Sequence, residues 1–321
     1  MQTIVGVLRG GPSHEHDISL KTGATLLSAL PREEFDVRDI YIDKSGTWFD
    51  RGRPSTPDRI LRQIDVAMPG MHGTYGGDGT LQHTLESFSI PYSGSDTIGT
   101  RISHNKALAK MRAIDAGIAT PDFVAIQSPN EIEEGAKAAM RMLQPVVVKP
   151  LAEGSSIGVT IVGGHAFVLR AIQDLFAQGV QGVLVEELVR GKEATVGIVD
   201  HMRGEPHYML PVIEVTRPTG TIYTHAMKRE NLVRLSCPGT FTRVEAEDLR
   251  RAAKKMHQAL GLRHYSRSDF IVSPRGIYYL ETNAHPSLAP QAPLPHALAS
   301  IGVSAQQFAR HLVNLARRGS P

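Results

Sequence analysis

The chain has 321 residues, which is more than one hydrophobic core usually covers, so two or three packed units are expected. Apolar residues make up 41% and charged residues 21%; these ordinary values exclude a wholly disordered chain, a collagen-like chain and a coiled coil. The 35 Lys and Arg residues nearly balance the 32 Asp and Glu residues, so the composition indicates no nucleic-acid partner.

The first hundred residues alternate between strand-like and helical patterns. Strand-like runs lie at Ile4–Leu8, Val37–Ile42 and Val66–Met71, and helical patterns lie at Ile18–Leu30 and Leu81–Phe88. Asp17 and Ser19 are candidate N-caps for the first helix. The alternation predicts the α/β class, with a parallel sheet covered by helices in a first unit at residues 1–100.

The next segment predicts a second, smaller unit at residues 101–187. We expect helices at Ser103–Gly117, Ser128–Leu143 and Ala166–Gln178, and strands at Val146–Lys149, Val159–Val162 and Gly182–Glu187. The second helix opens with a capping box over residues 128–131. A glycine-rich loop at residues 153–158 joins two strands directly, which predicts a hairpin.

The last segment, residues 188–321, is again mixed. We expect strands at Ala194–Val199, Met209–Val215, Asp269–Val272 and Ile277–Glu281, and helices at Ala246–Leu260 and from Ser304. A polar stretch at residues 216–242 has few helix or strand signals, and a long loop of this kind is typical of a functional lid. A proline-rich loop covers residues 285–295.

The loop GSSIG at residues 154–158 has three interpretations. It matches G-x-S-x-G, the nucleophile elbow of serine hydrolases, but that elbow needs a following helix and here a strand-like run follows. A plain hairpin turn would need only two or three small residues. We favour a flap whose backbone N–H groups cover phosphate oxygens, because small residues allow close approach.

Two lysines flank this loop in the sequence. Lys149 ends a buried strand, where a lysine is often merely solvated, and Lys106 lies on a helix that precedes the same unit. Two ammonium groups that converge on one place would cost stability without an anion, and they would bind a phosphate favourably.

Hard-oxygen side chains lie on two adjacent strand-like segments near the C-terminus. Glu281 and Asn283 are two residues apart and so point to one face, and Asp269 could meet them from the neighbouring strand. Such a set suits magnesium that also touches phosphates, although each residue alone could be a solvated strand end. Arg267 beside the set would suit charge developing at an acyl phosphate.

Taken in order, these motifs resemble the D-alanine–D-alanine ligases, ATP-grasp enzymes of peptidoglycan precursor synthesis. Residues 10–19, GGPSHEHDIS, are similar to the family's G-G-x-S-x-E-x-x-[VI]-S opening. Residues 72–82, HGTYGGDGTLQ, are similar to H-G-x-x-G-E-D-G-x-[LI]-Q, with Gly77 in place of Glu. PYSGS at residues 91–95, VKP at 148–150 and EGSSIGV at 153–159 match further family segments.

The resemblance implies a three-part ATP-grasp architecture in which two lobes sandwich ATP. The implied catalytic residues are Glu15, Ser155 and Arg267; the implied substrate-binding residues are His72, Lys228, Arg229 and Ser287; and the implied ATP-binding residues are Lys106, Lys149, Glu153, Ser156, Glu186, Val189 and Glu193. Asp269, Glu281 and Asn283 would bind two Mg²⁺ ions, which Mn²⁺ could replace. ATP would phosphorylate a first D-amino acid, and the amine of a second would attack the acyl phosphate.

The departures from the family cluster on the second-substrate side. Lys228-Arg229 stands where the family's lid carries lysine and tyrosine, Ser287 replaces a glycine, and Ala292 replaces a serine. Two alternatives therefore stay open beside D-alanyl-D-alanine formation. One is a ligase of natural-product or modified-wall synthesis with a different second substrate, and the other is a nucleotide-binding homologue without catalysis.

The remaining expectations concern compartment and partners. The single cysteine, Cys237, excludes an intramolecular disulfide and fits a reducing compartment. No apolar run reaches the ~18 residues of a spanning helix, and the N-terminus lacks a signal-peptide pattern. We expect a cytoplasmic protein with small-molecule substrates and no membrane partner, and the resemblance suggests a homodimer.

Overall fold

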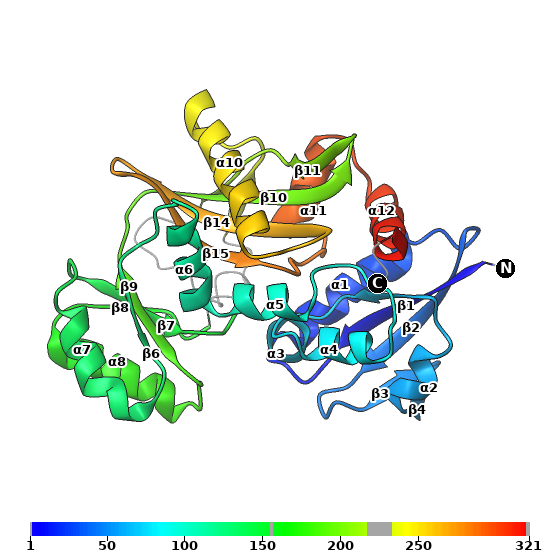
Figure 1. Ribbon diagram of the computed structural model, residues 1–321, viewed down its shortest axis with the longest axis horizontal. Coiled ribbons are helices and arrows are strands. Elements are labelled where there is room, and N and C mark those ends of the chain that lie inside the picture. Colours follow the sequence, from blue (N-terminus) through cyan, green and yellow to red (C-terminus); the bar gives the residue numbers. More distant parts are fainter. Residues whose placement is uncertain (1, 155–156, 217–232, 319–321) are drawn as a thin grey trace.

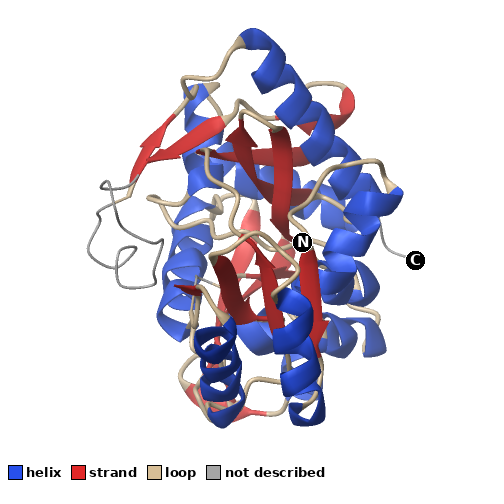
Figure 2. Cartoon of the chain, turned by 90° about the vertical axis from the view of Figure 1, so that its left-hand side faces the viewer, coloured by secondary structure: helices blue, strands red, loops and turns tan. Residues whose placement is uncertain are grey.

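The computed structural model describes residues 2–154, 157–216 and 233–318. These residues form three sheets, which lie at the right, at the lower left and above the centre of Figure 1. Turned by 90°, the molecule shows strands at its centre and helices on both sides (Figure 2). The predicted α/β class is confirmed.

The first sheet lies in the N-terminal segment and has the strand order β4-β3-β2-β1-β5. Its bounds are β1 (Thr3–Gly10), β2 (Phe35–Ile42), β3 (Trp48–Asp50), β4 (Arg53–Ser55) and β5 (Val66–Pro69). The predicted strands β1, β2 and β5 are parallel, as expected, whereas the antiparallel strands β3 and β4 at one end of the sheet were not predicted. These two strands have only three residues each, too few to show a period of two.

Helices cover this first sheet and lead out of it. They are α1 (His16–Ala29), α2 (Pro57–Leu61), α3 (Gly73–Gly76) and α4 (Thr80–Ser87). Glu15 occupies the N-cap of α1 without a side-chain capping bond, so the prediction of Asp17 or Ser19 as cap is wrong: both lie inside the helix.

The second sheet is antiparallel throughout, with the order β6-β9-β7-β8. It comprises β6 (Phe123–Ile126), β7 (Val146–Pro150), β8 (Thr160–Val162) and β9 (Val183–Glu187), with the helices α7 (Ile132–Ala139) and α8 (His165–Ala177) beside it. The predicted hairpin is confirmed, because β7 and β8 pair with Val146 opposite Val162.

The predicted capping box before α7 does not form. The Ser128 hydroxyl lies 3.2 Å from Glu131 Oε1 and donates to it, instead of accepting from a backbone N–H. The first turn, Pro129–Glu131, is a 3₁₀ helix as a result, and α7 begins only at Ile132.

The third sheet has the order β13-β12-β10-β14-β15, and β11 pairs with β10. Its bounds are β10 (Lys192–Met202), β11 (Glu205–Met209), β12 (Ile213–Thr216), β13 (Arg234–Ser236), β14 (Tyr265–Ser273) and β15 (Gly276–Asn283), with α10 (Arg243–Ala259) packed on it. The strand predicted at residues 209–215 is interrupted at residues 210–212, where Pro211 cannot donate to a ladder. Most of the predicted lid, residues 217–232, lies outside the described residues.

Two helix predictions differ from the structure at the joints between the sheets. The single helix expected at residues 103–117 is two, α5 (Thr97–His104) and α6 (Lys106–Asp115), because Asn105 is extended and its side chain caps α6. The proline-rich loop contains an unpredicted helix, α11 (Pro293–Ser300), which begins with proline in its first turn. The final helix, α12 (Ala305–Arg318), was predicted.

The hydrophobic cores connect these parts. One core contains Val5, Val7 and Met68 of the first sheet together with Leu312 and Val313 of α12. Another joins Ala109 and Ala113 of α6 to the third sheet, while Ala107 of the same helix packs on Leu184 of the second sheet, so α6 lies between the two. No helix among the described residues is long and apolar enough to cross a membrane.

Candidate active site

A cleft of about 1930 Å³ is lined by residues of the second and third sheets and, on the N-terminal side, by α1 and the loop that follows β5. Of the residues singled out from the sequence, those that the structure describes all line it: Glu15, His72, Lys106, Lys149, Glu153, Glu186, Val189, Glu193, Arg267, Asp269, Glu281, Asn283 and Ser287. Ala292 lines it as well. Ser155, Ser156, Lys228 and Arg229 lie outside the described residues.

Buried opposite charges form one wall of the cleft. Lys149 on β7 and Glu186 on β9 form an ion pair, because β7 and β9 are neighbours in the sheet. Lys110 of α6 approaches the same carboxylate, with its Nζ 2.9 Å from Glu186 Oε2 and 2.7 Å from Thr120 Oγ1. Two ammonium groups thus share one carboxylate, and the surplus positive charge favours an anion at this wall.

Burial and the neighbouring charges together set the protonation of Lys110 and Glu186. Burial lowers the pKa of Lys110 to about 8, although the negative charge of Glu186 acts to raise that pKa. Burial also acts to raise the pKa of Glu186, but the two lysines outweigh it and the net pKa is lowered. The carboxylate is therefore ionised at neutral pH and holds both lysines in place.

Lys110 was not predicted as part of the site. It lies four residues after Lys106 on the same helix, a spacing that places both side chains on one face. That spacing was a usable signal, but the partner, Glu186, is distant in the sequence and is brought near only by the fold.

Lys106 connects the glycine-rich loop to the acidic side of the cleft. Its Nζ donates to the Glu153 carbonyl oxygen at 2.5 Å and lies 3.4 Å from Glu281 Oε2. The extended Asn105 starts a new helix at this lysine, and the Lys106 amide donates to the Leu151 carbonyl oxygen at 3.0 Å. The lysine therefore reaches both the loop and the carboxylate.

The acidic side is built on three neighbouring strands. Asp269 on β14 lies opposite Thr195 on β10 and opposite Glu281 on β15. Asp269 accepts hydrogen bonds from Thr195 Oγ1 at 2.5 Å and from Arg267 Nε and Nη2 at 3.1 and 2.8 Å. Thr195, which was not predicted, and Arg267 thereby fix the orientation of the carboxylate.

These donors fit a hard divalent cation. Asp269 and Glu281 face each other across β14 and β15, and a register irregularity follows at residues 269–270. Asn283 lies opposite Arg267 in the same pairing, and its amide nitrogen is buried with no hydrogen-bond partner in the described part of the chain. The two carboxylates suit a metal ion, and the unsatisfied N–H donor of Asn283 suits a phosphate oxygen that accompanies the ion.

The other end of the cleft is polar and closely packed. His72 Nε2 lies 2.7 Å from Thr22 Oγ1, and His72 Nδ1 lies 3.1 Å from the carbonyl oxygen of His285. Since a carbonyl only accepts, Nδ1 carries the proton and Nε2 accepts from the Thr22 hydroxyl. Burial lowers the pKa of His72, which agrees with this neutral tautomer. Ser287 Oγ lies 3.1 Å from Thr22 Oγ1 and joins the same network.

Glu15 lies between this network and the glycine-rich loop. A Cβ atom added to Gly154 would lie 2.8 Å from Glu15 Oε2, so only a glycine allows the loop to approach this closely. Glu153 beside it has a raised pKa, because the residue is partly buried and because Glu15 carries the same charge. Val189 is buried on the wall after β9, and Glu193 lies on β10 opposite Ile271 and Val215.

The comparisons with known proteins agree on one family. The family model described as D-ala D-ala ligase N-terminus matches residues 4–95, and the model described as D-ala D-ala ligase C-terminus matches residues 113–314. Among curated relatives, D-alanine--D-alanine ligases of Syntrophobacter fumaroxidans and Syntrophotalea carbinolica are 35% and 32% identical. The alignments cover 97% of this chain in both cases, and 97% and 95% of the relatives.

Solved structures show the same fold. D-alanyl-alanine synthetase A from Vibrio cholerae has a TM-score of 0.85 at 26% identity, with 98% of this chain and 99% of that chain covered. The VanG D-Ala:D-Ser ligase from Enterococcus faecalis also has a TM-score of 0.85, at 24% identity, with 98% and 100% covered. The ATP-grasp architecture is therefore confirmed, and the chain belongs to the D-alanine–D-alanine ligase family.

Proposed function

We propose that this protein is an ATP-dependent ligase that forms D-alanyl-D-alanine for peptidoglycan precursor synthesis, through an acyl-phosphate intermediate. The observation that carries the proposal is the single cleft in which Lys106 and Lys149 face Asp269 and Glu281. Cations on one side and carboxylates on the other suit a nucleotide triphosphate with its metal ions. The curated relatives compared above carry the name D-alanine--D-alanine ligase.

ATP would lie along the wall between the second and third sheets. Lys149 and Lys106 would bind its phosphate oxygens, and Lys110 would hold Glu186 in place from behind. Glu186, the backbone of Val189 and Glu193 would bind the adenine and ribose, since all three line the cleft near β9 and β10. Glu153 and Ser156 belong to the loop proposed to cover the phosphates.

Asp269, Glu281 and Asn283 would hold two Mg²⁺ ions, with Mn²⁺ as a substitute. Bound there, the ions would neutralise charge on the transferred phosphoryl group. Thr195 and Arg267 donate hydrogen bonds that orient Asp269, and Lys106 lies beside Glu281. These residues thus orient the carboxylate of Asp269 and balance the charge of Glu281.

The chemistry requires two bond-forming steps. A carboxylate oxygen of the first D-alanine attacks the γ-phosphorus of ATP, the bond to the β-phosphate oxygen breaks, and ADP leaves. The amine of the second D-alanine then attacks the acyl carbon, loses a proton, and inorganic phosphate departs. Arg267 would stabilise the oxyanion of the second step, Glu15 would bind the first ammonium, and Ser155 would connect Glu15 to the lid.

The residues around the second substrate support one alternative to D-alanyl-D-alanine formation. His72 would bind the first carboxylate, and Lys228, Arg229 and Ser287 would contact the substrates. The Ser287 hydroxyl places an extra polar group beside Thr22 where the family's motif has glycine. A different amine or a hydroxy acid as acceptor is therefore the second candidate function.

Three further features belong to the proposal. The chain is divided into units at residues 1–100, 101–187 and 188–321, with α6 packed against both the second and the third sheets. The protein forms a homodimer, which light scattering after gel filtration would test. Its compartment is the cytoplasm, which fits a substrate pool of free D-amino acids and ATP.

The test is ATP-dependent phosphate release by purified protein with Mg²⁺ and a panel of D- and L-amino acids, with products identified by mass. Release that needs D-alanine and yields D-alanyl-D-alanine is expected. Release with D-alanine but without the dipeptide would identify a different acceptor. ATP binding without release under any condition would favour the non-catalytic interpretation and overturn the proposal.

A further inference from the structure

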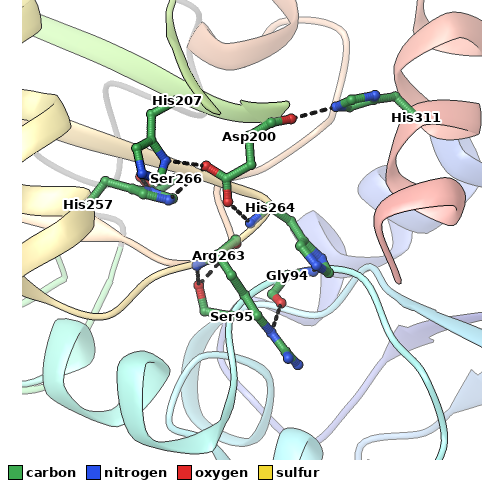
Figure 3. Close-up of polar contacts among 9 residues, drawn as sticks. All are labelled: Gly94, Ser95, Asp200, His207, His257, Arg263, His264, Ser266 and His311. Carbon is green, nitrogen blue, oxygen red and sulfur yellow. Dashed lines mark hydrogen bonds and ion pairs between the residues drawn. The ribbon is translucent and has the colours of Figure 1, made fainter. Parts of the chain in front are cut away.

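A second group of chemically reactive side chains lies outside the cleft. Asp200 on β10, His207 on β11 and His257 near the end of α10 bring one carboxylate and two imidazoles together (Figure 3). Asp200 and His207 are direct partners in the antiparallel pairing of β10 with β11. No part of the proposed ligase reaction uses these three residues, and none of them lines the cleft.

The donor atoms are as close as the ligands of a metal ion. Asp200 Oδ1 lies 2.8 Å from His207 Nδ1 and 3.2 Å from His257 Nε2. One donor atom from each residue lies within 4.8 Å of the other two. Tetrahedral zinc with ligands at about 2.0–2.2 Å has donor atoms ~3.3 Å apart, so the separation of Asp200 from His257 matches that value, and the hydrogen-bonded pair of Asp200 and His207 would open by roughly 0.5 Å.

His257 supplies an independent sign of a missing partner. Its side chain is fully buried, and its Nε2 atom has no hydrogen-bond partner among the described residues although it lies near the carboxylate. Its other nitrogen, Nδ1, lies 2.7 Å from Ser266 Oγ. If the serine accepts from Nδ1, the lone pair of Nε2 points toward Asp200, which is the arrangement of a metal-bound histidine with its outer partner.

Neighbouring groups fix the orientation of the Asp200 carboxylate. Its Oδ2 accepts from the His264 backbone N–H at 2.5 Å, and its carbonyl oxygen lies 2.7 Å from His311 Nε2, so Oδ1 is left to face the imidazoles. The side chain of His207 is 27% exposed, which gives an ion a route from solvent.

We propose that Asp200, His207 and His257 form a zinc-binding site separate from the ligase centre. Two imidazole nitrogens and one carboxylate oxygen suit Zn²⁺, whereas Mg²⁺ prefers oxygen ligands alone. Water from the His207 side completes the fourth position. The site lies five residues along β10 from Thr195, a separation of about 17 Å at ~3.3 Å per residue, so the ion ties β10, β11 and α10 together without entering the reaction.

The test is metal binding by the chelator-stripped full chain in excess Mg²⁺, which occupies oxygen-only sites. Co²⁺ is the first probe, because tetrahedral Co²⁺ absorbs strongly in the visible range. We expect one equivalent of Co²⁺ to give this spectrum, Zn²⁺ to displace it, and Zn²⁺ to raise the melting temperature.

Two variants and a control make the test specific. His207→Gln changes a partly exposed side chain and Asp200→Asn keeps the shape of a buried one, and each should weaken Zn²⁺ binding by more than about tenfold while the circular dichroism spectrum is unchanged. His83→Gln, an exposed histidine on α4, should bind as the wild type does. A missing tetrahedral Co²⁺ spectrum, or wild-type Zn²⁺ affinity in both variants, would overturn the proposal whether or not the ligase activity is found.

Discussion

Lys149 lies where the buried ion pair meets the cleft. Its partner, Glu186, is also bound by Lys110, so removal of Lys149 leaves the carboxylate with one cation and does not leave it unpaired. A substitution at Lys149 therefore changes the charge offered to the nucleotide more than it changes the stability of the fold.

Lys149→Met should lower kcat/KM for ATP by at least about 100-fold, because a positive charge next to the transferred phosphates is lost. The measurement is ADP release at saturating D-alanine. Lys44→Met, which changes an exposed lysine between β2 and β3, is the matched control and should keep the wild-type rate. A near-normal rate in Lys149→Met would remove this lysine from the phosphate site.

Glu281→Gln tests the metal ligands with almost no change of shape. The neutral amide binds a divalent cation more weakly, so we expect a loss of about 100-fold in kcat and a higher Mg²⁺ requirement in a titration of activity. Glu205→Gln, at an exposed position of β11, should leave both unchanged. An unaltered Mg²⁺ requirement in Glu281→Gln would show that Glu281 does not bind the ion.

His285 gives the stability of the protein a dependence on pH. Burial lowers the pKa of His285 to about 3 in the folded protein. Below pH 6.5 the unfolded chain binds a proton at this residue and the folded protein does not, so stability falls as the pH falls. Between pH 6.5 and 5 the loss is on the order of 2 kcal/mol.

His285→Gln removes this titration. Urea unfolding at pH 7 and pH 5 should show a smaller loss of unfolding free energy in the variant than in the wild type. His83→Gln, at an exposed position, should keep the wild-type pH dependence. The same pH dependence in all three proteins would mean that His285 is not buried in its neutral form.

Residues that lie in sequence motifs were found from the sequence, and residues that act through distant partners were not. Glu15, Lys149 and Glu281 each belong to a local pattern, and all line the cleft. The sequence around Lys110 indicates only an ordinary helix lysine, and its contact with Glu186 depends on the packing of α6 beside β9. Asp200 and His257 are likewise far apart in the sequence, and only the strand pairing and the packing of α10 bring them together.

At the scale of elements, long periodic segments were predictable and interruptions were not. The helices α1, α8 and α10 repeat an apolar face over several turns, whereas Asn105 interrupts one helical pattern without glycine or proline. In α11, prolines at residues 293 and 295 read as a loop, yet they occupy the first turn, where proline is compatible with a helix.

The break at Asn105 is expected to matter for ATP binding. The Asn105 side chain accepts from the Leu108 amide at 3.1 Å and starts the helix that carries Lys106 and Lys110. Asn105→Ala should cost about 1 kcal/mol of stability and raise the KM for ATP, because the first turn of α6 positions Lys106.

Asp96→Ala is the matched control for this prediction. Asp96 caps α5 in the same way, with its side chain 2.8 Å from the Gly99 amide, but α5 carries none of the residues proposed to bind ATP. The two variants should lose similar stability in thermal melts, and only Asn105→Ala should change the KM for ATP. An equal effect on KM would mean that general destabilisation, and not the position of Lys106, is responsible.

At the scale of the whole molecule, the two ends of the chain share one hydrophobic core. Leu312 and Val313 of α12 are fully buried in the cluster that contains Val5 and Val7 of β1. Arg310 of α12 also pairs with Glu34, with Nε 2.8 Å from Oε2. The second sheet has a separate core, which includes the fully buried Val168 of α8. The first and third sheets should therefore unfold together, and the second sheet should be more independent.

The single tryptophan, Trp48 on β3, allows this to be measured, because its fluorescence reports on the first sheet alone. Leu312→Ala, made near the C-terminus, should cost about 2–5 kcal/mol and lower the denaturant midpoint seen by Trp48 fluorescence and by circular dichroism to the same extent. Val168→Ala, an equally buried change on α8 in the core of the second sheet, should shift the circular dichroism transition more than the Trp48 transition. If Leu312→Ala left the Trp48 midpoint unchanged, the first sheet would be stable without α12, and the shared core would not couple the two ends.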